Sequence, residues 1–561
     1  MKKSHLLIAL MALCTLGFAQ TSAPEKTIIQ IDLNKKVGEM STMWAWFGAD
    51  EPNYAYMKDG KKLLTELSQL SPVPVYFRAH NMLTSGHDTL TMKWGSTNVY
   101  TEDANGKPIY DWTVVDKIFD TYQQRGIKPM AQFSFMPEAL STKPQPYEHN
   151  WKPGMNYTEI FKGWTYPPKD YKKWADLVYA WVKHSVERYG KTEVESWYWE
   201  LWNEPNIGYW SGTVEEYCKL YDYTADAAKR ALPTIRIGGP ETTGPSWNKA
   251  ADFLKTFLTH CQSGTNYVTG KVGSPLDFIT FHAKGSPKIV EGHVQMNVGT
   301  QLRDISEGFR IVTSYPKFKK LPIIIGESDP EGCAACGMKT NPSNAYRNGT
   351  MYSSYTAASF ARKYALADYF KANLLGAVSW SFEFENQPYF YGFRDLATNG
   401  INKPVLNVFR MYGMMSGNRV EVKGNQNYTF SMVRDSSVRK KADIDALASK
   451  DQRSAAVMVW HYHDDDVKAE DATIEVDLKG FPAQQVNFKH YRIDNENSNS
   501  YEVWKKMGSP ENPTAEQINT LEKAGQLTLL TSPTYIKTDN GNLKLNLKLP
   551  RQGVSLLKFD W

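Results

Sequence analysis

The sequence is poor in several features that mark common protein classes. It has no long basic run, and its 65 basic and 60 acidic residues leave a net charge of only +5 over 561 residues. A nucleic-acid-binding surface is therefore not indicated. Hydrophobic residues make up 41% and charged residues 22% of the chain, which argues against a disordered, collagen-like or polytopic membrane protein. What remains is a globular protein with a full core, with an excess of aromatic residues at 13%.

Cysteine is also scarce, with 5 in the chain. Cys14 lies near the N-terminus, and four others follow: Cys218, Cys261, Cys333 and Cys336. These allow one or two disulfides in an oxidising compartment, and their spacing does not set the pairing. Cys333-x-x-Cys336 is not followed by a second ligand pair, so it is weak evidence for zinc.

The first residues have the pattern of a signal peptide. Lys2 and Lys3 precede the apolar run LLIALMALCTLGFA, which ends near Ala19. About 14 apolar residues are too few to span a bilayer, and a small residue at the end suits cleavage. We expect residues 1–19 to be a signal peptide, with export to the periplasm or outside the cell and no stable membrane insertion.

Between residues 41 and 405, apolar runs alternate with helical patterns. Continuous apolar runs predict strands that are buried on both faces, as in a parallel sheet. The run of Tyr171, Trp174, Leu177 and Trp181 predicts a helix that ends near Gly190, and Thr213 with Glu216 forms a capping-box pattern at the start of another. The eight runs are MWAWFGAD, VPVYFRA, IKPMAQFSFMP, VESWYWELWNEP, TIRIGGPE, LDFITFHA, LPIIIGESDP and LGAVSWSFEF. They predict an α/β fold, a (β/α)₈ TIM barrel.

The pattern of hydrophobic runs changes in residues 406–561. The runs there are short and separated by turns, and LKLNLKLP alternates strictly, so that one face is buried and one is wet. The other runs are YTFSMVRD, AAVMVWHYHD, TIEVDLKG, VNFKHYRID and GVSLLKFDW. This region predicts a C-terminal antiparallel β-sandwich, and TIIQIDLN within residues 20–40 is expected to add a strand to it.

Carboxylates stand at the ends of two predicted barrel strands. The fourth run ends Trp202-Asn203-Glu204-Pro205 and the seventh ends Gly326-Glu327-Ser328-Asp329. Active sites of such barrels lie at the C-terminal ends of the strands, and an unpaired carboxylate is costly at a buried strand tip. Two carboxyl groups across a cleft are what glycoside hydrolysis requires. A separation near 5–5.5 Å gives retention and 6.5–9.5 Å gives inversion; the sequence leaves this open.

Asn203-Glu204-Pro205 with Glu327 resembles the retaining glycoside hydrolases of clan A. Within that clan the chain is similar to glycoside hydrolase family 39, the family of β-xylosidases and α-L-iduronidases, over nearly the whole chain. The resemblance is carried by RAHNMLTSG, RYGKTEVESWYWELWNEPN, IRIGGPE, LDFITFHAKG, NGINKPVLNVFRM and RIDNENSNSYEVWKKMGSPENPTAEQ. These segments follow the family's order and spacing.

The resemblance implies roles for the matching positions. Glu204 is expected to be the general acid/base, Glu327 the nucleophile, and Asn203 a hydrogen-bond partner of the sugar 2-hydroxyl. We expect an ionised Glu327 to raise the pKa of Glu204. His80 and His282 match positions that line the sugar pocket, although a lone histidine in a barrel is more often a core residue.

The substrate depends on strand six, which ends His282-Ala283-Lys284. This resembles α-L-iduronidases more than the xylosidases, and a lysine at a strand tip suits an anionic group. The alternative is a salt bridge from Lys284 to Glu383 or Glu385. Arg394 is a candidate to complete a uronate clamp, and Trp380 and Glu383 are further candidate sugar contacts.

We therefore expect a retaining exo-glycosidase that needs no metal or organic cofactor and acts on a carbohydrate. A β-xylosidase is the family default, an iduronidase-like or arabinosyl activity is the alternative, and a non-catalytic carbohydrate-binding protein is the competing class. Oligomeric state is not indicated. Aromatic residues at strand ends are expected to wall the pocket: Trp44, Trp46, Trp202, Tyr209, Trp210, Trp380, Tyr389 and Tyr391.

Overall fold

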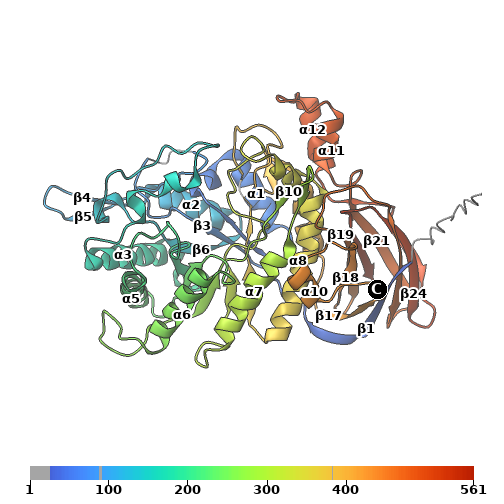
Figure 1. The fold of residues 1–561 in the computed structure, drawn as a ribbon, viewed down its shortest axis with the longest axis horizontal. Helices are drawn as coiled ribbons and strands as arrows, with labels where there is room; N and C mark the ends of the chain where they lie inside the picture. Colours follow the sequence, from blue (N-terminus) through green and yellow to red (C-terminus); the bar gives the residue numbers. More distant parts are fainter. Residues whose placement is uncertain (1–25, 88–90, 382) are drawn as a thin grey trace, which may run out of the picture.

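The protein has two parts, a strand-and-helix barrel and a β-sheet domain that packs against its side. The computed structural model describes residues 26–87, 91–381 and 383–561, so the signal peptide expected over residues 1–19 lies outside the described residues. Figure 1 shows the barrel in blue to yellow and the sheet domain in orange and red. Within the described ranges, no helix is long and apolar enough to cross a membrane.

The barrel is a closed sheet of parallel strands. Neighbours follow the order β13-β12-β9-β8-β7-β6-β3-β2-β14, and β13 and β14 are two pieces of one strand, so the pairing of Ser379 with Phe47 closes the sheet. The strands are β2 (Trp46–Ala49), β3 (Val75–Ala79), β6 (Ile127–Phe133), β7 (Tyr198–Leu201), β8 (Ile237–Thr242), β9 (Phe278–Phe281), β12 (Ile323–Ile325), β13 (Leu374–Ala377) and β14 (Ser379–Trp380). They coincide with the eight apolar runs, and the predicted TIM barrel is confirmed.

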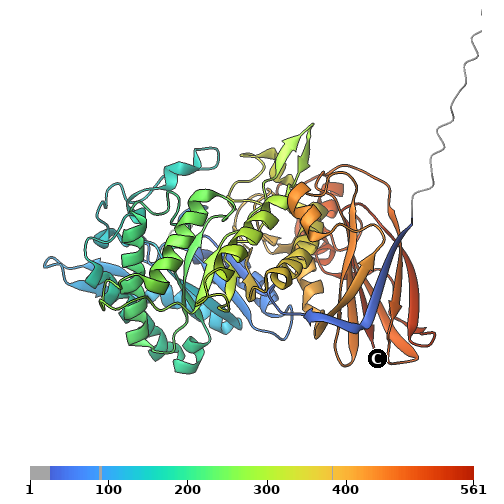
Figure 2. The same cartoon turned by 60° about the horizontal axis from the view of Figure 1, so that its bottom comes forward.

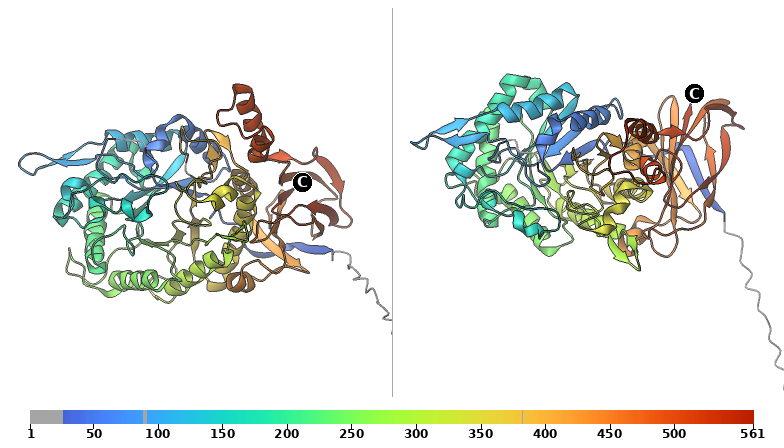
Figure 3. Two further views of the ribbon diagram at one scale, coloured as in Figure 1. Left: turned by 45° about the horizontal axis from the view of Figure 1, so that its top comes forward. Right: turned by 90° about the horizontal axis from the view of Figure 1, so that it is seen from above.

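A helix follows each barrel strand and covers the outside of the sheet (Figure 3, left). Asp170 caps the first turn of α3, which ends before Gly190 as the sequence predicts. The capping box of Thr213 and Glu216 opens α5. The helices are α1 (Lys58–Ser68), α2 (Thr113–Gln124), α3 (Tyr171–Tyr189), α5 (Val214–Ala231), α6 (Asn248–Ser263), α7 (Val298–Thr313), α8 (Thr350–Phe370) and α9 (Pro404–Gly413), with a short α4 (Lys191–Glu195) before β7.

Inside the barrel, the two-residue period of the strands sorts side chains by depth. On β3 the inward column runs from Tyr76 to Arg78, and on β9 it starts at Phe278 and continues past the strand to His282 and Lys284. The upstream aromatic rings contact one another, with Tyr76 and Trp46 stacked at 4.1 Å between centroids. The downstream positions carry charge, so the same strands form an apolar plug at one end and a polar mouth at the other.

The second domain is an antiparallel β-sandwich, as predicted, with one parallel pair. Its strand order is β22-β21-β25-β19-β18-β17-β1-β20-β24, with β23 beside β21. Figure 2 shows the N-terminal β1 lying among the later strands; it is antiparallel to β17 and parallel to β20. The strands are β1 (Thr27–Glu39), β17 (Asn418–Gly424), β18 (Asp443–Lys450), β19 (Ser454–Tyr462), β20 (Ala472–Lys479), β21 (Gln485–Ile493), β22 (Thr528–Leu529), β23 (Thr534–Lys537), β24 (Asn542–Leu549) and β25 (Val554–Asp560).

One predicted strand of the sandwich is wrong. The run YTFSMVRD contains helix α10 (Phe430–Ser436), because the Thr429 side chain accepts a hydrogen bond from the Met432 amide and caps a helical turn. Phe430 faces the barrel helices, in contact with Tyr369 at the end of α8. Four strands of the sandwich are not predicted from the sequence: β17, β18, β22 and β23. The segment DIDALASK of β18, for example, has little aromatic or β-branched character.

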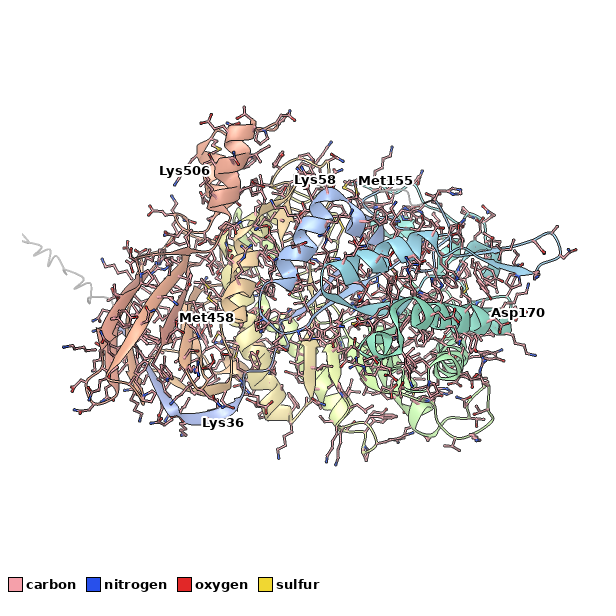
Figure 4. All side chains as sticks on the ribbon, turned by 180° about the vertical axis from the view of Figure 1, so that it is seen from behind. Lys36, Lys58, Met155, Asp170, Met458 and Lys506 are labelled. Atoms are coloured by element: carbon pink, nitrogen blue, oxygen red, sulfur yellow. A yellow bond between two sulfur atoms is a disulfide. The ribbon has the colours of Figure 1, made fainter. Side chains whose placement is uncertain are left out.

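Two small helices form an insert at the junction of the two domains. They are α11 (Ser500–Lys506) and α12 (Ala515–Ala524), and Figure 4 shows Lys506 on this insert, which projects beyond the body, whereas Met458 lies within the sandwich. Short hairpins pair β4 (Tyr100–Glu102) with β5 (Pro108–Tyr110), β10 (Lys288–Val290) with β11 (His293–Gln295), and β15 (Ala397–Thr398) with β16 (Ile401–Asn402).

The cysteines follow one of the patterns left open by the sequence. Cys333 and Cys336 form a disulfide in the loop after β12. Cys218 and Cys261 are buried free thiols. The Cys333-x-x-Cys336 motif is therefore a loop staple and not half of a zinc site.

Candidate active site

The two predicted catalytic carboxylates meet at the polar mouth of the barrel. Glu204 follows β7 by three residues and Glu327 follows β12 by two. An oxygen of each and a ring nitrogen of His282 lie within 4.8 Å of one another. Glu204 is 8% exposed and Glu327 is 4% exposed, so both carboxylates look into an enclosed site.

The backbone around Glu204 is strained into position. Trp202 has a φ of 69° and Glu204 a φ of 45°, both in the left-handed region that non-glycine residues rarely adopt. The Glu204 amide donates to the Glu241 carbonyl over 2.8 Å, and this bond between neighbouring strands helps to hold the turn. Such strain is typical of functional sites, where the surroundings fix an unfavourable conformation.

Lys284 bridges the two glutamates. Its Nζ lies 2.6 Å from Glu327 Oε2 and 3.4 Å from Glu204 Oε1. The alternative role considered from the sequence, a salt bridge to Glu383 or Glu385, is wrong, because the side chain continues the inward column of β9 toward the catalytic carboxylates. The side chain of Lys284 is 21% exposed, more than either partner, so it covers them from the solvent side.

His282 connects Glu204 to the carboxylate of Glu241 on the neighbouring strand. Its Nδ1 is 2.9 Å from Glu204 Oε1 and its Nε2 is 3.0 Å from Glu241 Oε2. Burial opposes a positive charge on the ring, but Glu327 and Glu241 outweigh it and raise the pKa of His282. The imidazole thus stands between the acidic groups, hydrogen-bonded to Glu204 and in ion-pair contact with Glu241.

Arg78, at the end of β3, contacts three of the carboxylates in the site. Its guanidinium contacts Glu200 at 2.5 Å, Glu241 at 3.3 Å and Glu327 at 3.7 Å. It also donates to Asn203 Oδ1 over 3.1 Å. This bond orients the amide so that its NH₂ group is left to face a ligand.

The pKa values of Glu204 and Glu327 are both lowered in the structure, whereas the sequence predicts a raised pKa for Glu204. Burial would raise both pKa values, but Lys284 and His282 outweigh it. They lower the pKa of Glu204 to about 2 and hold that of Glu327 well below its usual range. The expected rise at Glu204 is therefore wrong for the ligand-free protein, because the effect of the neighbouring Glu327 is smaller than that of the bridging ammonium.

His80 lies on the far side of Glu327. Its Nδ1 is 2.9 Å from Gln132 Oε1, and its Nε2 lies 3.5 Å from Glu327 Oε1 and 3.6 Å from Asp50 Oδ1. Burial and the nearby Arg78 lower the pKa of His80. With Nδ1 against Gln132, Nε2 faces the carboxylates of Glu327 and Asp50.

Arg394 and Trp380 complete the wall beneath Glu327. The guanidinium of Arg394 lies 3.7 Å from Glu327 Oε2 and 3.7 Å from Asp329 Oδ2. Its Cζ and that of Arg78 stand 5.8 and 5.7 Å from the Trp380 ring centroid. Trp380 is fully buried, so it supports the two arginines.

Glu383 is not brought to the catalytic pair. Its Oε1 accepts from the Gly400 amide over 3.3 Å, and the charged groups that act on it are Asp395, Asp59 and Lys403. Burial raises its pKa well above the usual range. The structure thus gives Glu383 contacts with the loop after β14 and none with the catalytic glutamates.

The predicted aromatic walls divide into three groups. Trp44 and Trp46 are buried at the upstream end of the barrel, so their assignment to the pocket is wrong. Trp202, Tyr209 and Trp210 pack on one another behind Glu204. Tyr389 and Tyr391 are half-buried and line a cavity of about 990 Å³ beside the insert.

The sequence reasoning missed several acidic and basic members of the site. Glu241 ends the run IGGPE and Asp50 ends WFGAD, so both obey the rule of charged groups at strand ends that identified Glu204. Glu200 was signalled by a lone charge within the buried run YWEL. Lys93, which pairs with Asp50, comes from the loop after β3 and had no comparable signal.

A metal ion is not needed to hold this arrangement. Glu204, His282 and Glu327 offer three closely spaced ligand atoms. Lys284, Arg78 and Arg394 already place positive charge against the same carboxylates. A divalent cation would have to displace Lys284 and tolerate both arginines.

Comparison with known proteins identifies relatives over almost the full length. The family model described as glycosyl hydrolases family 39 matches residues 27–538. A β-xylosidase of Caldicellulosiruptor saccharolyticus is 28% identical over 89% of this chain and 91% of its own. An α-L-iduronidase of Mus musculus is 26% identical over 67% of this chain and 60% of its own. The crystal structure of a monomeric β-xylosidase from Caulobacter crescentus CB15 superposes with a TM-score of 0.74 at 22% identity, covering 95% of this chain and 99% of that one.

Proposed function

Because the chain belongs to glycosyl hydrolases family 39 and is a glycoside hydrolase, we propose that it removes terminal sugars from the non-reducing ends of glycans with retention of anomeric configuration. The observation that carries the mechanism is the proximity of Glu204 and Glu327, which each bring one carboxylate oxygen within 4.8 Å of the other. That separation suits direct attack by a carboxylate and leaves little room for an intervening water. Glu204 acts as the acid/base and Glu327 as the nucleophile.

In the first step, Glu327 attacks the anomeric carbon while Glu204 gives its proton to the departing glycosidic oxygen. The bond from carbon to that oxygen breaks, and an ester between the sugar and Glu327 forms. In the second step, Glu204 takes a proton from water, and the resulting hydroxide oxygen displaces Glu327 from the same carbon. Two inversions give net retention.

The neighbours of Glu327 support its role as nucleophile. Arg78 and Arg394 each lie 3.7 Å from one of its oxygens, so the carboxylate is kept ionised by cations besides Lys284. We assign the sugar 2-hydroxyl to Asn203, which precedes Glu204 in the chain and accepts a hydrogen bond from Arg78. A contact at that hydroxyl strengthens in the transition state.

A β-xylosyl terminus is the default substrate. The β-xylosidase of Caldicellulosiruptor saccharolyticus shares 28% identity over nearly its whole length. A second candidate is a uronic-acid terminus, because Lys284 and Arg394 place two cations beside Glu327. An arabinosyl terminus has no specific support from the site.

The test is hydrolysis of aryl β-D-xyloside, α-L-arabinoside and α-L-iduronide, with the first-formed sugar followed by proton NMR. We expect turnover of the β-D-xyloside or the α-L-iduronide and a product of unchanged anomeric configuration. An inverted product would contradict the mechanism. Glycan binding without any turnover, equal in the wild type and Glu327→Gln, would instead identify a carbohydrate-binding protein.

Export is a separate part of the proposal. It is supported by the leader pattern over residues 1–19 and by the Cys333–Cys336 disulfide, since disulfides persist in oxidising compartments. Intact mass of the protein recovered from the producing cells should show loss of the leader. Full-length mass in the cytoplasmic fraction would contradict export.

A further inference from the structure

The position of Lys284 poses a problem for catalysis by the two glutamates. Its ammonium touches Glu327 Oε2 at 2.6 Å and Glu204 Oε1 at 3.4 Å. In a retaining mechanism the anomeric carbon must come within about 3–3.5 Å of the nucleophile, and the glycosidic oxygen must reach the acid. The ammonium therefore occupies the space that the scissile bond needs.

We propose that Lys284 is an interlock, which blocks the catalytic pair in the ligand-free enzyme and is released productively by a carboxylate on the bound sugar. This inference rests on the proposed retaining mechanism of Glu204 and Glu327. It adds that release of Lys284 both opens the site and permits Glu204 to carry the proton that it must donate. Lys284 acts through Glu204 and is a positioning residue for acid catalysis.

The two glutamates depend on Lys284 to different degrees. Glu327 keeps Arg78 and Arg394 at 3.7 Å after Lys284 leaves, so the nucleophile stays ionised. Glu204 keeps only the imidazole of His282 at 2.9 Å among the cations that contact it in the described structure. Release of one ammonium thus leaves Glu327 as an ionised nucleophile and lets Glu204 become a protonated acid.

The charge balance around Glu204 agrees with this separation. Burial favours the protonated acid, and Lys284 is the strongest influence that opposes it and lowers the pKa to about 2. While Lys284 is in contact, Glu204 therefore stays ionised and lacks the proton that an acid must donate. The other charged groups around the pair are Glu327, Arg394 and, at the Lys284 backbone, Asp304; none of them replaces the ammonium at Glu204.

A sugar carboxylate is suited to release the interlock. It offers the ammonium a new partner, and Arg394 beside Glu327 offers the same carboxylate a second cation. The side chain of Lys284 is 21% exposed and covers the glutamates from outside, so it can move toward a ligand without disrupting the barrel. A neutral sugar must displace the ammonium with no counter-charge.

Two substrates form a matched pair for the test. An aryl β-D-xyloside and an aryl α-L-iduronide have the same configuration at carbons 1 to 4 and differ by the carboxylate on carbon 5. Each is prepared with leaving groups from 4-nitrophenol to phenol, because only poor leaving groups require protonation. kcat/KM and its pH profile are measured for the wild type, Lys284→Met, and the control Lys423→Met, an exposed sandwich lysine.

We expect the wild type to show a steep leaving-group dependence on xylosides and a shallow one on iduronides. Lys284→Met should raise kcat/KM for phenyl xyloside at least tenfold, within the 10²–10⁴-fold range of general acid catalysis, and extend activity to higher pH. The same variant should lose at least 100-fold on the iduronide. Lys423→Met should match the wild type.

Equal leaving-group slopes and pH profiles for the wild type and Lys284→Met on xylosides would overturn the interlock while leaving the proposed function intact. A parallel loss on both substrates in Lys284→Met would also overturn it, since that result indicates a purely structural lysine. Failure of the wild type to turn over any glycoside would overturn the proposed function itself and the interlock with it.

Discussion

The two ends of the barrel interior are built from the same strands but obey opposite rules. At the upstream end, Trp46, Tyr76, Tyr198 and Phe278 pack ring against ring, with centroids 4.1 to 5.3 Å apart. Two to six residues further along the strands, the side chains are arginine, glutamate, histidine and lysine. The apolar end is held by contacts among its own rings, whereas the charged end is held by ion pairs between carboxylates and cations.

This difference separates stability from activity along one axis. Burying aromatic surface stabilises the fold, while burying a group of carboxylates does so only if cations and hydrogen bonds compensate. At the mouth, that compensation is supplied by Arg78, Arg394 and Lys284. We expect changes at the plug to alter the free energy of unfolding and changes at the mouth to alter the rate.

The largest expected effect is at the nucleophile. Glu327→Gln keeps the size of the side chain and removes the negative oxygen, so kcat should fall by about 10⁴–10⁶-fold, as measured with an aryl glycoside on protein whose fold is verified by circular dichroism. Glu421→Gln, in the sandwich, is the matched control and should leave kcat unchanged. A loss of less than tenfold in Glu327→Gln would show that another group attacks the sugar.

The acid/base residue should show a dependence on leaving group. Glu204→Gln cannot protonate the departing oxygen, so kcat/KM for phenyl glycosides should fall by about 10²–10⁴-fold and much less for 2,4-dinitrophenyl glycosides. Azide should restore turnover by replacing water in the second step, because it needs no base. Equal losses for all leaving groups, with no response to azide, would contradict the assignment.

At the apolar end the expected effect is on stability alone. Trp46→Ala leaves a cavity against Tyr76 and Tyr198 and should lower the free energy of unfolding by about 3–5 kcal/mol, as measured by denaturant titration. The kcat of the folded fraction should not change. Val272→Ala, at a side chain that is 76% exposed, is the control. A pH–rate profile that is altered in Trp46→Ala would contradict the claim that the apolar end affects stability and not activity.

A smaller effect is expected at Lys363, a buried cation on α8 that is outside the mouth. It is fully buried, its Nζ has no hydrogen-bond partner among the described residues, and burial lowers its pKa to about 7. Between pH 7 and 10.5 the unfolded chain binds the extra proton, so stability rises with pH there. Lys363→Met should stabilise the protein by about 1–3 kcal/mol at pH 6 and by less at pH 10.

Thermal or denaturant unfolding at the two pH values measures this difference. A gain that is equal at pH 6 and pH 10 would mean that Lys363 is not a titrating, uncompensated cation.

The sequence was sufficient to predict those parts of the molecule that depend on local pattern. Eight apolar runs predicted the barrel strands, and Asn203-Glu204-Pro205 and Glu327 at strand ends predicted the meeting of two carboxylates. The helix ending at Gly190 followed from its periodicity. Each of these depends on residues close together in the chain.

What could not be predicted depends on contacts across the barrel. The sequence leaves Lys284 either with an anionic group of the sugar or in a salt bridge to Glu383 or Glu385, and only the three-dimensional arrangement places its ammonium on Glu204 and Glu327. The direction in which the pKa of Glu204 shifts depends on that contact, so the rise predicted from the sequence is wrong. Its place near a strand end predicts Trp46 as a pocket residue, but the sequence does not show at which end of the strand it lies. Phe430 lies in a helix since Thr429 caps it.

The most direct test of the central claim is a covalent trap. A 2-deoxy-2-fluoro glycosyl fluoride of whichever glycone the panel identifies slows both steps, the second more than the first, so the glycosyl-enzyme should accumulate. Peptide mass spectrometry should then find one sugar on the peptide that contains Glu327, and none in Glu327→Gln. Label on another residue, or no label together with an inverted product, would contradict the account.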